Sequence, residues 1–119
     1  GLAGGPCIES ILESAGGDRE LARQLILIFN EDTAERLASL DLSISSGDLK
    51  AARNNAHAIK GACAQMGLTE LKELSHSVET AATDSDPQKT AAAFTRLRQC
   101  FGETAGILDA IRDKLIQEK

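Results

Sequence analysis

The feature that most constrains the fold is a run of apolar residues between positions 49 and 66, spaced three and four residues apart. Its members are Leu49, Ala52, Ala56, Ile59, Cys63 and Met66. A helix completes one turn every ~3.6 residues, so this spacing places all six side chains on one helical face. The run therefore predicts a helix whose apolar face packs into a core, and Gly67 marks its end.

Three further segments repeat this spacing, and each predicts an amphipathic helix. They cover residues 18 to about 45, residues 68–82, and the chain from residue 87 onward. Their apolar positions are Leu21, Leu25, Ile28, Leu37, Leu40 and Ile44 in the first, Leu68, Leu71, Leu74, Val78 and Ala81 or Ala82 in the second, and Phe94, Leu97, Phe101, Leu108, Ile111 and Leu115 in the third. Gly102 and Gly106 weaken the middle of the last segment and leave room for a bend there.

Four such helices joined by short connections predict an all-α fold, an antiparallel four-helix bundle. Composition agrees, because Ala and Leu dominate the apolar residues, Val occurs once, and Tyr and Trp are absent. Residues 7–14, which follow Pro6, predict a short extra helix at the N-terminus that covers one end of the bundle. Residues 1–6 are interpreted as a linker or tag remnant, and residues 7–119 as a single domain.

Charge and cysteine usage exclude several classes of protein. The net charge of −5 provides no basic excess for binding nucleic acid or a membrane surface. The longest apolar run, residues 25–29, is too short to span a membrane, and no signal peptide is visible.

Cys7, Cys63 and Cys100 show no metal-ligand spacing, which favours a reducing, cytoplasmic setting. Cys63 falls on the apolar face and is interpreted as a core residue. The glycine-rich start without Met leans toward an excised domain.

His57 is the first candidate for chemistry. It lies roughly 130° around the helix from the centre of the apolar face, so its ring is expected to project into solvent. Lys60 and Gly61 lie one turn further along the same surface. A glycine inside a helix costs about 1 kcal/mol relative to alanine, and close approach of another molecule beside His57 would explain it. The alternative is an ordinary surface histidine beside a solvated lysine and a tolerated glycine.

His76 and Glu79 form a second candidate pair on the following helix, three residues apart. If the two helices are antiparallel across Gly67, His57 and Glu79 lie at similar distances from the turn and could touch. A carboxylate that accepts the Nδ1 proton would fix the tautomer of His57 and leave the lone pair of Nε2 free. That arrangement is typical of an oriented nucleophile.

These residues together resemble a known family. The run from Ala56 to Gly61, followed by Gly67 and Leu71, is similar to the signature of histidine phosphotransfer (HPt) domains, H-x-x-K-G with a later glycine and leucine. The likeness spans about residues 8–116 and includes Gly17, Asp18, Glu20, Leu21, Phe29 and the segment 46–49. It is closest to the phosphorelay type. Two departures, Ala62-Cys63 and Leu68, are small or apolar substitutions.

The resemblance implies a role for each site residue. His57 would carry the phosphoryl group, Lys60 would supply charge beside it, and Gly61 would give the partner clearance. His76 and Glu79 match positions that the phosphotransfer domain of chemotaxis kinases also fills with His and Glu, where the glutamate is thought to hydrogen-bond the active histidine. Many phosphorelay members carry Gln at the position of Glu79.

The expected function is therefore that of a phosphocarrier, not a self-sufficient enzyme. His57 would accept a phosphoryl group from a receiver-domain aspartate and pass it to another receiver. Mg²⁺ would come from the receiver, since this chain offers no metal site of its own. Ala58, Gly61 and Ala64 would form a flat contact surface for response-regulator receivers, with Arg53 at the rim and His76 beside it. A histidine kinase or hybrid sensor kinase is a further partner, and a monomer is expected.

Two other functions remain as alternatives to a phosphocarrier. A non-catalytic adaptor or dimerisation module explains the bundle but gives no reason for the exposed Lys60-Gly61 pair beside His57. A metal or haem bundle that uses His57 and His76 needs ligands that point inward, whereas His57 is expected to point outward. The sequence leaves open whether the domain stands alone or belongs to a hybrid kinase.

Overall fold

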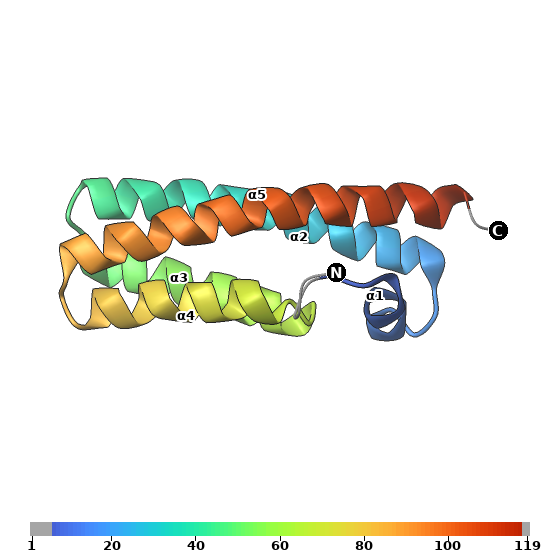
Figure 1. The fold of residues 1–119 in the computed structure, drawn as a ribbon, viewed down its shortest axis with the longest axis horizontal. Helices are drawn as coiled ribbons and strands as arrows, with labels where there is room; N and C mark the ends of the chain where they lie inside the picture. The colour runs from blue at the N-terminus through green and yellow to red at the C-terminus, as the bar shows by residue number, and fades with distance from the viewer. Residues whose placement is uncertain (1–5, 118–119) are drawn as a thin grey trace.

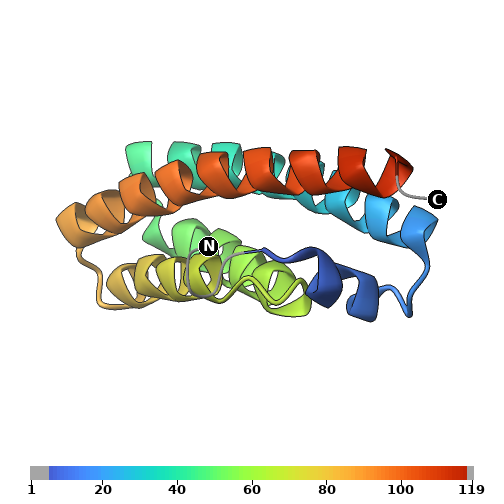
Figure 2. The ribbon, with the colours of Figure 1, turned by 45° about the vertical axis from the view of Figure 1, so that its right-hand side comes forward.

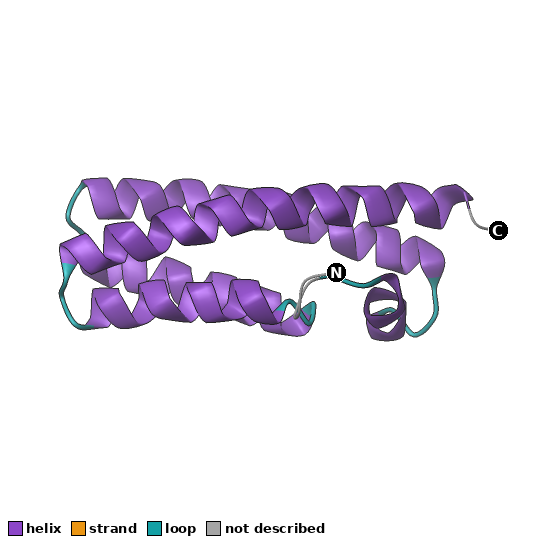
Figure 3. Ribbon diagram, viewed as in Figure 1, coloured by secondary structure: helices purple, strands orange, loops and turns teal. Residues whose placement is uncertain are grey.

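The computed structural model describes residues 6–117, and helices account for nearly all of them. In chain order the helices are α1 (Ile8–Ser14), α2 (Arg19–Ser45), α3 (Leu49–Gln65), α4 (Thr69–Thr83) and α5 (Pro87–Gln117). No strand occurs in this part of the chain (Figure 3). The all-α class predicted from the sequence is confirmed. The expected linker, apart from Pro6, lies outside the described residues.

Helices α2 to α5 form an antiparallel four-helix bundle (Figure 1). Each packs against the next along the chain, and α5 packs against α2 to close the bundle. Because α2 and α5 are longer than α3 and α4, they extend past them at one end, and α1 packs against α2 there (Figures 1 and 2). None of the described helices is both long enough and apolar enough to cross a membrane.

Short capped turns set the antiparallel order. Asp18, Asp48 and Asp86 each accept a hydrogen bond from the backbone N–H three residues further on, which satisfies a free donor at a helix N-terminus. Gly47 and Gly67 adopt positive φ angles of 78° and 70°, a conformation that strongly favours glycine at these helix ends. The Gly67 turn therefore folds α4 back along α3, and this pairing builds the site.

The apolar face of α3 is buried as the sequence predicts, with Leu49 half-buried at its start. The buried face of α2 agrees with the expected one at Leu37 and Leu40 but differs from it earlier in the helix. Leu21 and Ile28, expected in the core, are exposed. The side chains that α2 buries are Ala22, Ile26, Phe29, Thr33, Leu37, Leu40 and Ser43. The expected stripe runs into the charged residues Asp32 and Arg36, whereas the observed one continues through two hydroxyl side chains. These hydroxyls are small enough to pack between helices, and they hide the core face from an apolar pattern.

Helix α5 continues without interruption past Gly102 and Gly106 and follows a gentle curve along the bundle (Figure 2). Phe101, beside these glycines, is buried and its ring lies 6.3 Å from that of Phe29 in α2. The aromatic pair secures the middle of α5 against α2. Gly102 and Gly106 allow a bend, but they do not interrupt the helix.

Candidate functional site

His57 projects from the middle of α3 into solvent. Its side chain is 68% exposed, while Ala56 and Ile59 on either side are fully buried. The same helical turn therefore anchors the backbone in the core and leaves the imidazole open to solvent. This is the orientation that the apolar stripe predicts.

Glu79 of α4 contacts both His57 and Lys60 of α3. Its Oε2 lies 2.8 Å from Nδ1 of His57, and its Oε1 accepts a hydrogen bond of 2.6 Å from Nζ of Lys60. The side chain of Glu79 is only 18% exposed, so these contacts are partly shielded from water. The structure thus brings His57, Lys60 and Glu79 together across the interface between α3 and α4.

The protonation of this cluster follows from the charge on Glu79. The hydrogen bond from Lys60, with a further one from His57, lowers the pKa of Glu79, although burial acts in the opposite direction. An ionised carboxylate can only accept hydrogen bonds, so Nδ1 of His57 must be the donor. Nε2 has no hydrogen-bond partner among residues 6–117. Its lone pair in the neutral ring is therefore free and faces solvent.

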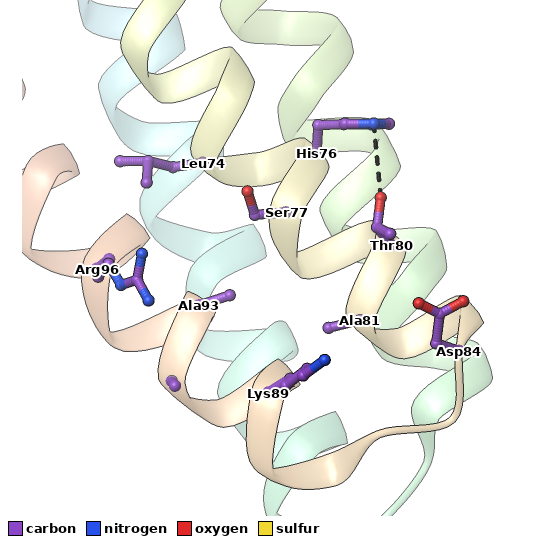
Figure 4. A pocket seen from close by; sticks show the side chains of 10 residues that line it. Leu74, His76, Ser77, Thr80, Ala81, Asp84, Lys89, Ala93 and Arg96 are labelled. Atoms are coloured by element: carbon purple, nitrogen blue, oxygen red, sulfur yellow. Dashed lines mark hydrogen bonds between the residues drawn. The ribbon is translucent and has the colours of Figure 1, made fainter.

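His76 lies at the edge of this cluster. Its Nδ1 is 3.6 Å from Oε1 of Glu79, and its Nε2 is 3.5 Å from Oγ1 of Thr80 on the next turn (Figure 4). Both contacts are long for hydrogen bonds, so neither fixes the ring firmly. The side chain is 63% exposed. His76 thus shares a carboxylate with His57 without making the short contact that orients His57.

The bundle itself gives no reason for a glycine at position 61. Gly61 is exposed within a regular stretch of α3, and a Cβ built there would meet nothing within 4 Å. Neither backbone strain nor packing requires it, although it lowers helix stability by about 1 kcal/mol relative to alanine. What the glycine provides is open space one turn away from His57.

Two grooves flank the exposed side of α3. The groove between α2 and α3, of about 580 Å³, is lined by Leu25, Ile28, Phe29, Asp32, Arg36, Ala58, Gly61 and Met66 among others. The groove between α3 and α4, of about 610 Å³, is lined by Lys60, Gly61, Ala64, Lys72, Glu73, His76 and Ser77. Gly61 lines both grooves, and because it has no side chain the ridge between them is low at this residue. We call this low point the glycine saddle. Arg53 lines neither groove and is exposed one turn before His57.

The sequence reasoning missed Leu25 and Ile28 as part of this surface, because it assigned them to the core. Ile28 is 55% exposed and Leu25 is half-buried, and both line the groove beside Gly61. The signal that could have placed them correctly is the charged pair Asp32 and Arg36, which follows them on the same side of α2. A core stripe does not continue through two charged residues.

The described residues offer no cluster of three or more His, Cys, Asp or Glu side chains that could hold a metal ion. The three cysteines are free thiols. Cys63 is fully buried, and this burial raises the pKa of its thiol to about 12. It is a core residue, as the sequence indicates, and carries no reactive thiolate.

An exposed histidine, held at one nitrogen and open at the other on a four-helix bundle, defines the class of phosphohistidine carriers. Comparison with known proteins agrees with this class. A family model described as "Hpt domain" matches residues 24–114. The chain therefore belongs to the Hpt domain family and is a histidine phosphocarrier.

A solved structure supports the fold assignment. The crystal structure of histidine-containing phosphotransfer protein B (HptB) from Pseudomonas aeruginosa PAO1 superposes with a TM-score of 0.83 at 24% sequence identity. The match covers 89% of this chain and 92% of that one. No curated protein matched the sequence.

Proposed function

We propose that His57 accepts a phosphoryl group from the phosphorylated aspartate of a receiver domain and passes it to a second receiver. The observation that carries this proposal is the 2.8 Å contact between Nδ1 of His57 and the ionised Glu79, which leaves the exposed Nε2 as the nucleophile. Glu79 is a positioning residue in this scheme. It sets the tautomer and does not touch the phosphoryl group.

The transfer step requires neither an oxidant nor an added base. The lone pair of Nε2 attacks phosphorus, an N–P bond forms, and the O–P bond of the aspartyl phosphate breaks to release the aspartate carboxylate. The ring keeps its proton on Nδ1 and gains positive charge, which the carboxylate of Glu79 stabilises. The reverse sequence at a second receiver returns the phosphoryl group to an aspartate.

Lys60 is proposed to stabilise the charge on the moving phosphoryl group. Its ammonium is already held beside His57 by the 2.6 Å hydrogen bond to Glu79. An ammonium has three N–H donors, so it can keep this bond while another donor reaches a phosphoryl oxygen. The second source of charge neutralisation, Mg²⁺, is expected to come from the acidic pocket of the receiver.

The receiver is proposed to dock over both sides of Gly61. On one side, Ile28 presents exposed apolar surface along the α2–α3 groove, and the half-buried Leu25 lines the groove beside it. Ala58 and Ala64, beside the glycine saddle, keep the surface low enough for a close approach to His57. Buried apolar area here would supply affinity, while the histidine cluster supplies the chemistry.

The domain is proposed to work as a monomer in the cytoplasm. All groups of the site come from one chain, so transfer requires no second copy. The three free thiols suit a reducing compartment.

The direct test is phosphate transfer from a panel of phosphorylated receiver domains, with the stability of the label in acid and base. Phosphoramidate on histidine should be labile in acid and stable in base. His57→Gln should remain folded, because the side chain is exposed, and should accept no label. Labelling of His57→Gln at the wild-type level would refute the assignment of the site.

A further inference from the structure

Helix α3 is strongly basic on a chain that is acidic overall. It carries Lys50, Arg53 and Lys60 and no acidic residue between positions 49 and 65, whereas the whole chain has a net charge of −5. These three cations occur at intervals of three and seven residues, with His57 between the second and third. They therefore follow the same exposed side of the helix as the histidine.

A fourth cation, Lys72 of α4, extends this basic surface along the α3–α4 groove. It lines the groove together with Lys60 and Ala64, on the side of His57 that leads to the Gly67 turn. One carboxylate, Glu73, lines the same groove. The neighbouring Glu70 accepts a hydrogen bond from the thiol of Cys100 and so faces α5.

Three of these four cations have no carboxylate partner in the part of the chain that the structure describes. Glu79 balances the charge of Lys60, but within residues 6–117 no carboxylate lies within ion-pair distance of Lys50, Arg53 or Lys72. All three side chains are exposed. We call Lys50, Arg53 and Lys72 the cationic rim of the site.

The stability of α3 does not account for Lys50, one member of the rim. Lys50 lies in the first turn of α3, where the helix dipole disfavours a positive charge. It is also seven residues from His57, which corresponds to about 10 Å along the helix axis. Lys50 is therefore too far away to share the phosphoryl group in the way proposed for Lys60.

We propose that the cationic rim steers an acidic protein surface onto His57. This inference rests on the proposed function: the partner is a receiver domain, whose carboxylates surround the phosphorylated aspartate and bind Mg²⁺. Charge complementarity of this kind raises the rate of association and fixes orientation more than it raises affinity. The rim thus acts on docking and leaves the chemistry at Nε2 unchanged.

A matched pair of double variants tests this proposal. Lys50→Glu with Lys72→Glu reverses charge on the rim, and Lys89→Glu with Arg96→Glu reverses the same charge in the groove between α4 and α5 (Figure 4). Both variants make the net charge more negative by the same amount. At low ionic strength the second-order rate of phosphate transfer from a receiver should fall about tenfold in the rim variant and less than about twofold in the control.

The effect should shrink as salt is added, because the Debye length falls to about 3 Å at 1 M salt. Phosphorylation by the small donor phosphoramidate should be equal in both variants and the wild type. Equal slowing by both double variants would show that net charge alone matters and would overturn the proposal. Slowing of the phosphoramidate reaction in the rim variant would also overturn it, because the rim would then act on chemistry. Failure of the wild type to accept phosphate from any receiver would instead refute the proposed function and this inference with it.

Discussion

His57 and His76 occupy similar positions on neighbouring helices, yet only one is arranged as a nucleophile. Both side chains are mostly exposed, and both place Nδ1 near the carboxylate of Glu79. For His57 the distance is 2.8 Å, whereas for His76 it is 3.6 Å. The Nε2 of His76 also lies near the hydroxyl of Thr80, while that of His57 has no partner within residues 6–117.

If His57 is the phosphorylated residue, as proposed, exposure alone does not identify the reactive histidine. What separates the two rings is a short contact at Nδ1, an open Nε2, and free space on the adjacent turn. Gly61 provides that space for His57. The predictions below test whether these three properties set the two histidines apart.

The largest effect is expected from removing the rings one at a time. His57→Gln should reduce receiver-dependent labelling by more than about 100-fold, since no other oriented nucleophile is present on this surface. His76→Gln should keep labelling within about twofold of the wild type, because a contact of 3.6 Å contributes little to orientation. Scintillation counting of trapped label measures both. Loss of labelling in His76→Gln would remove the distinction between the rings.

The second prediction concerns the free space beside His57. Gly61→Gln should slow transfer from a receiver by about tenfold, because its side chain blocks docking, and should raise the free energy of unfolding by up to about 1 kcal/mol, because glutamine is the better helix former. Gly102→Gln is the matched control: it is also an exposed, unobstructed helical glycine. It should stabilise the bundle similarly and leave transfer unchanged. Equal transfer rates in both variants would contradict the role of Gly61.

A third experiment changes the carboxylate that the two histidines share. Glu79→Gln should reduce the rate of phosphorylation about tenfold at neutral pH, because the amide cannot stabilise the charged ring. Rates with phosphoramidate isolate this effect from docking. Glu31→Gln, on an exposed position of α2, should leave the rate at the wild-type value. An unchanged rate in Glu79→Gln would show that the negative charge of Glu79 does not stabilise the phosphorylated ring.

The same carboxylate makes a prediction about pH and stability. Because the pKa of Glu79 is lower in the folded protein, its ionised form stabilises the fold at pH values above the ordinary pKa of glutamate. This contribution should be lost as the pH falls through the lowered folded pKa. Chemical denaturation at several pH values should therefore show a smaller acid-side loss of stability in Glu79→Gln than in the wild type. Identical pH profiles would contradict the pKa shift.

The smallest effect is expected on the apolar side of the docking surface. Ile28→Ser should raise the apparent KM for a phosphorylated receiver about threefold, since it removes exposed apolar contact area, and should barely change stability. Leu42→Ser removes a still more exposed apolar side chain elsewhere on α2 and should not change KM. The same KM for both variants would show that the α2–α3 groove does not contact the receiver.

The sequence predicts some of these features well because they depend on local spacing. The apolar stripe of α3 fixes which residues are buried, so the outward direction of His57 and the open position of Gly61 follow from helical geometry. The approach of Glu79 to His57 follows from counting residues on each side of Gly67. All three depend only on two helices and one turn.

Other features depend on contacts that the sequence does not display. The buried face of α2 includes Thr33 and Ser43, and only packing against α3 and α5 shows that these small hydroxyl residues face the core. The exposure of Ile28 follows from that shift. That Lys60 shares a carboxylate with His57 depends on side-chain conformations, which spacing alone does not set.

The most direct test of the central claim is the nitrogen-15 NMR spectrum of the imidazole rings before and after phosphorylation. The account predicts that Nδ1 of His57 carries a proton in the resting protein, where it donates to Glu79, and that phosphorus couples to Nε2 of the same ring after transfer. Phosphorus coupled to Nδ1 of His57, or to either nitrogen of His76, would contradict it.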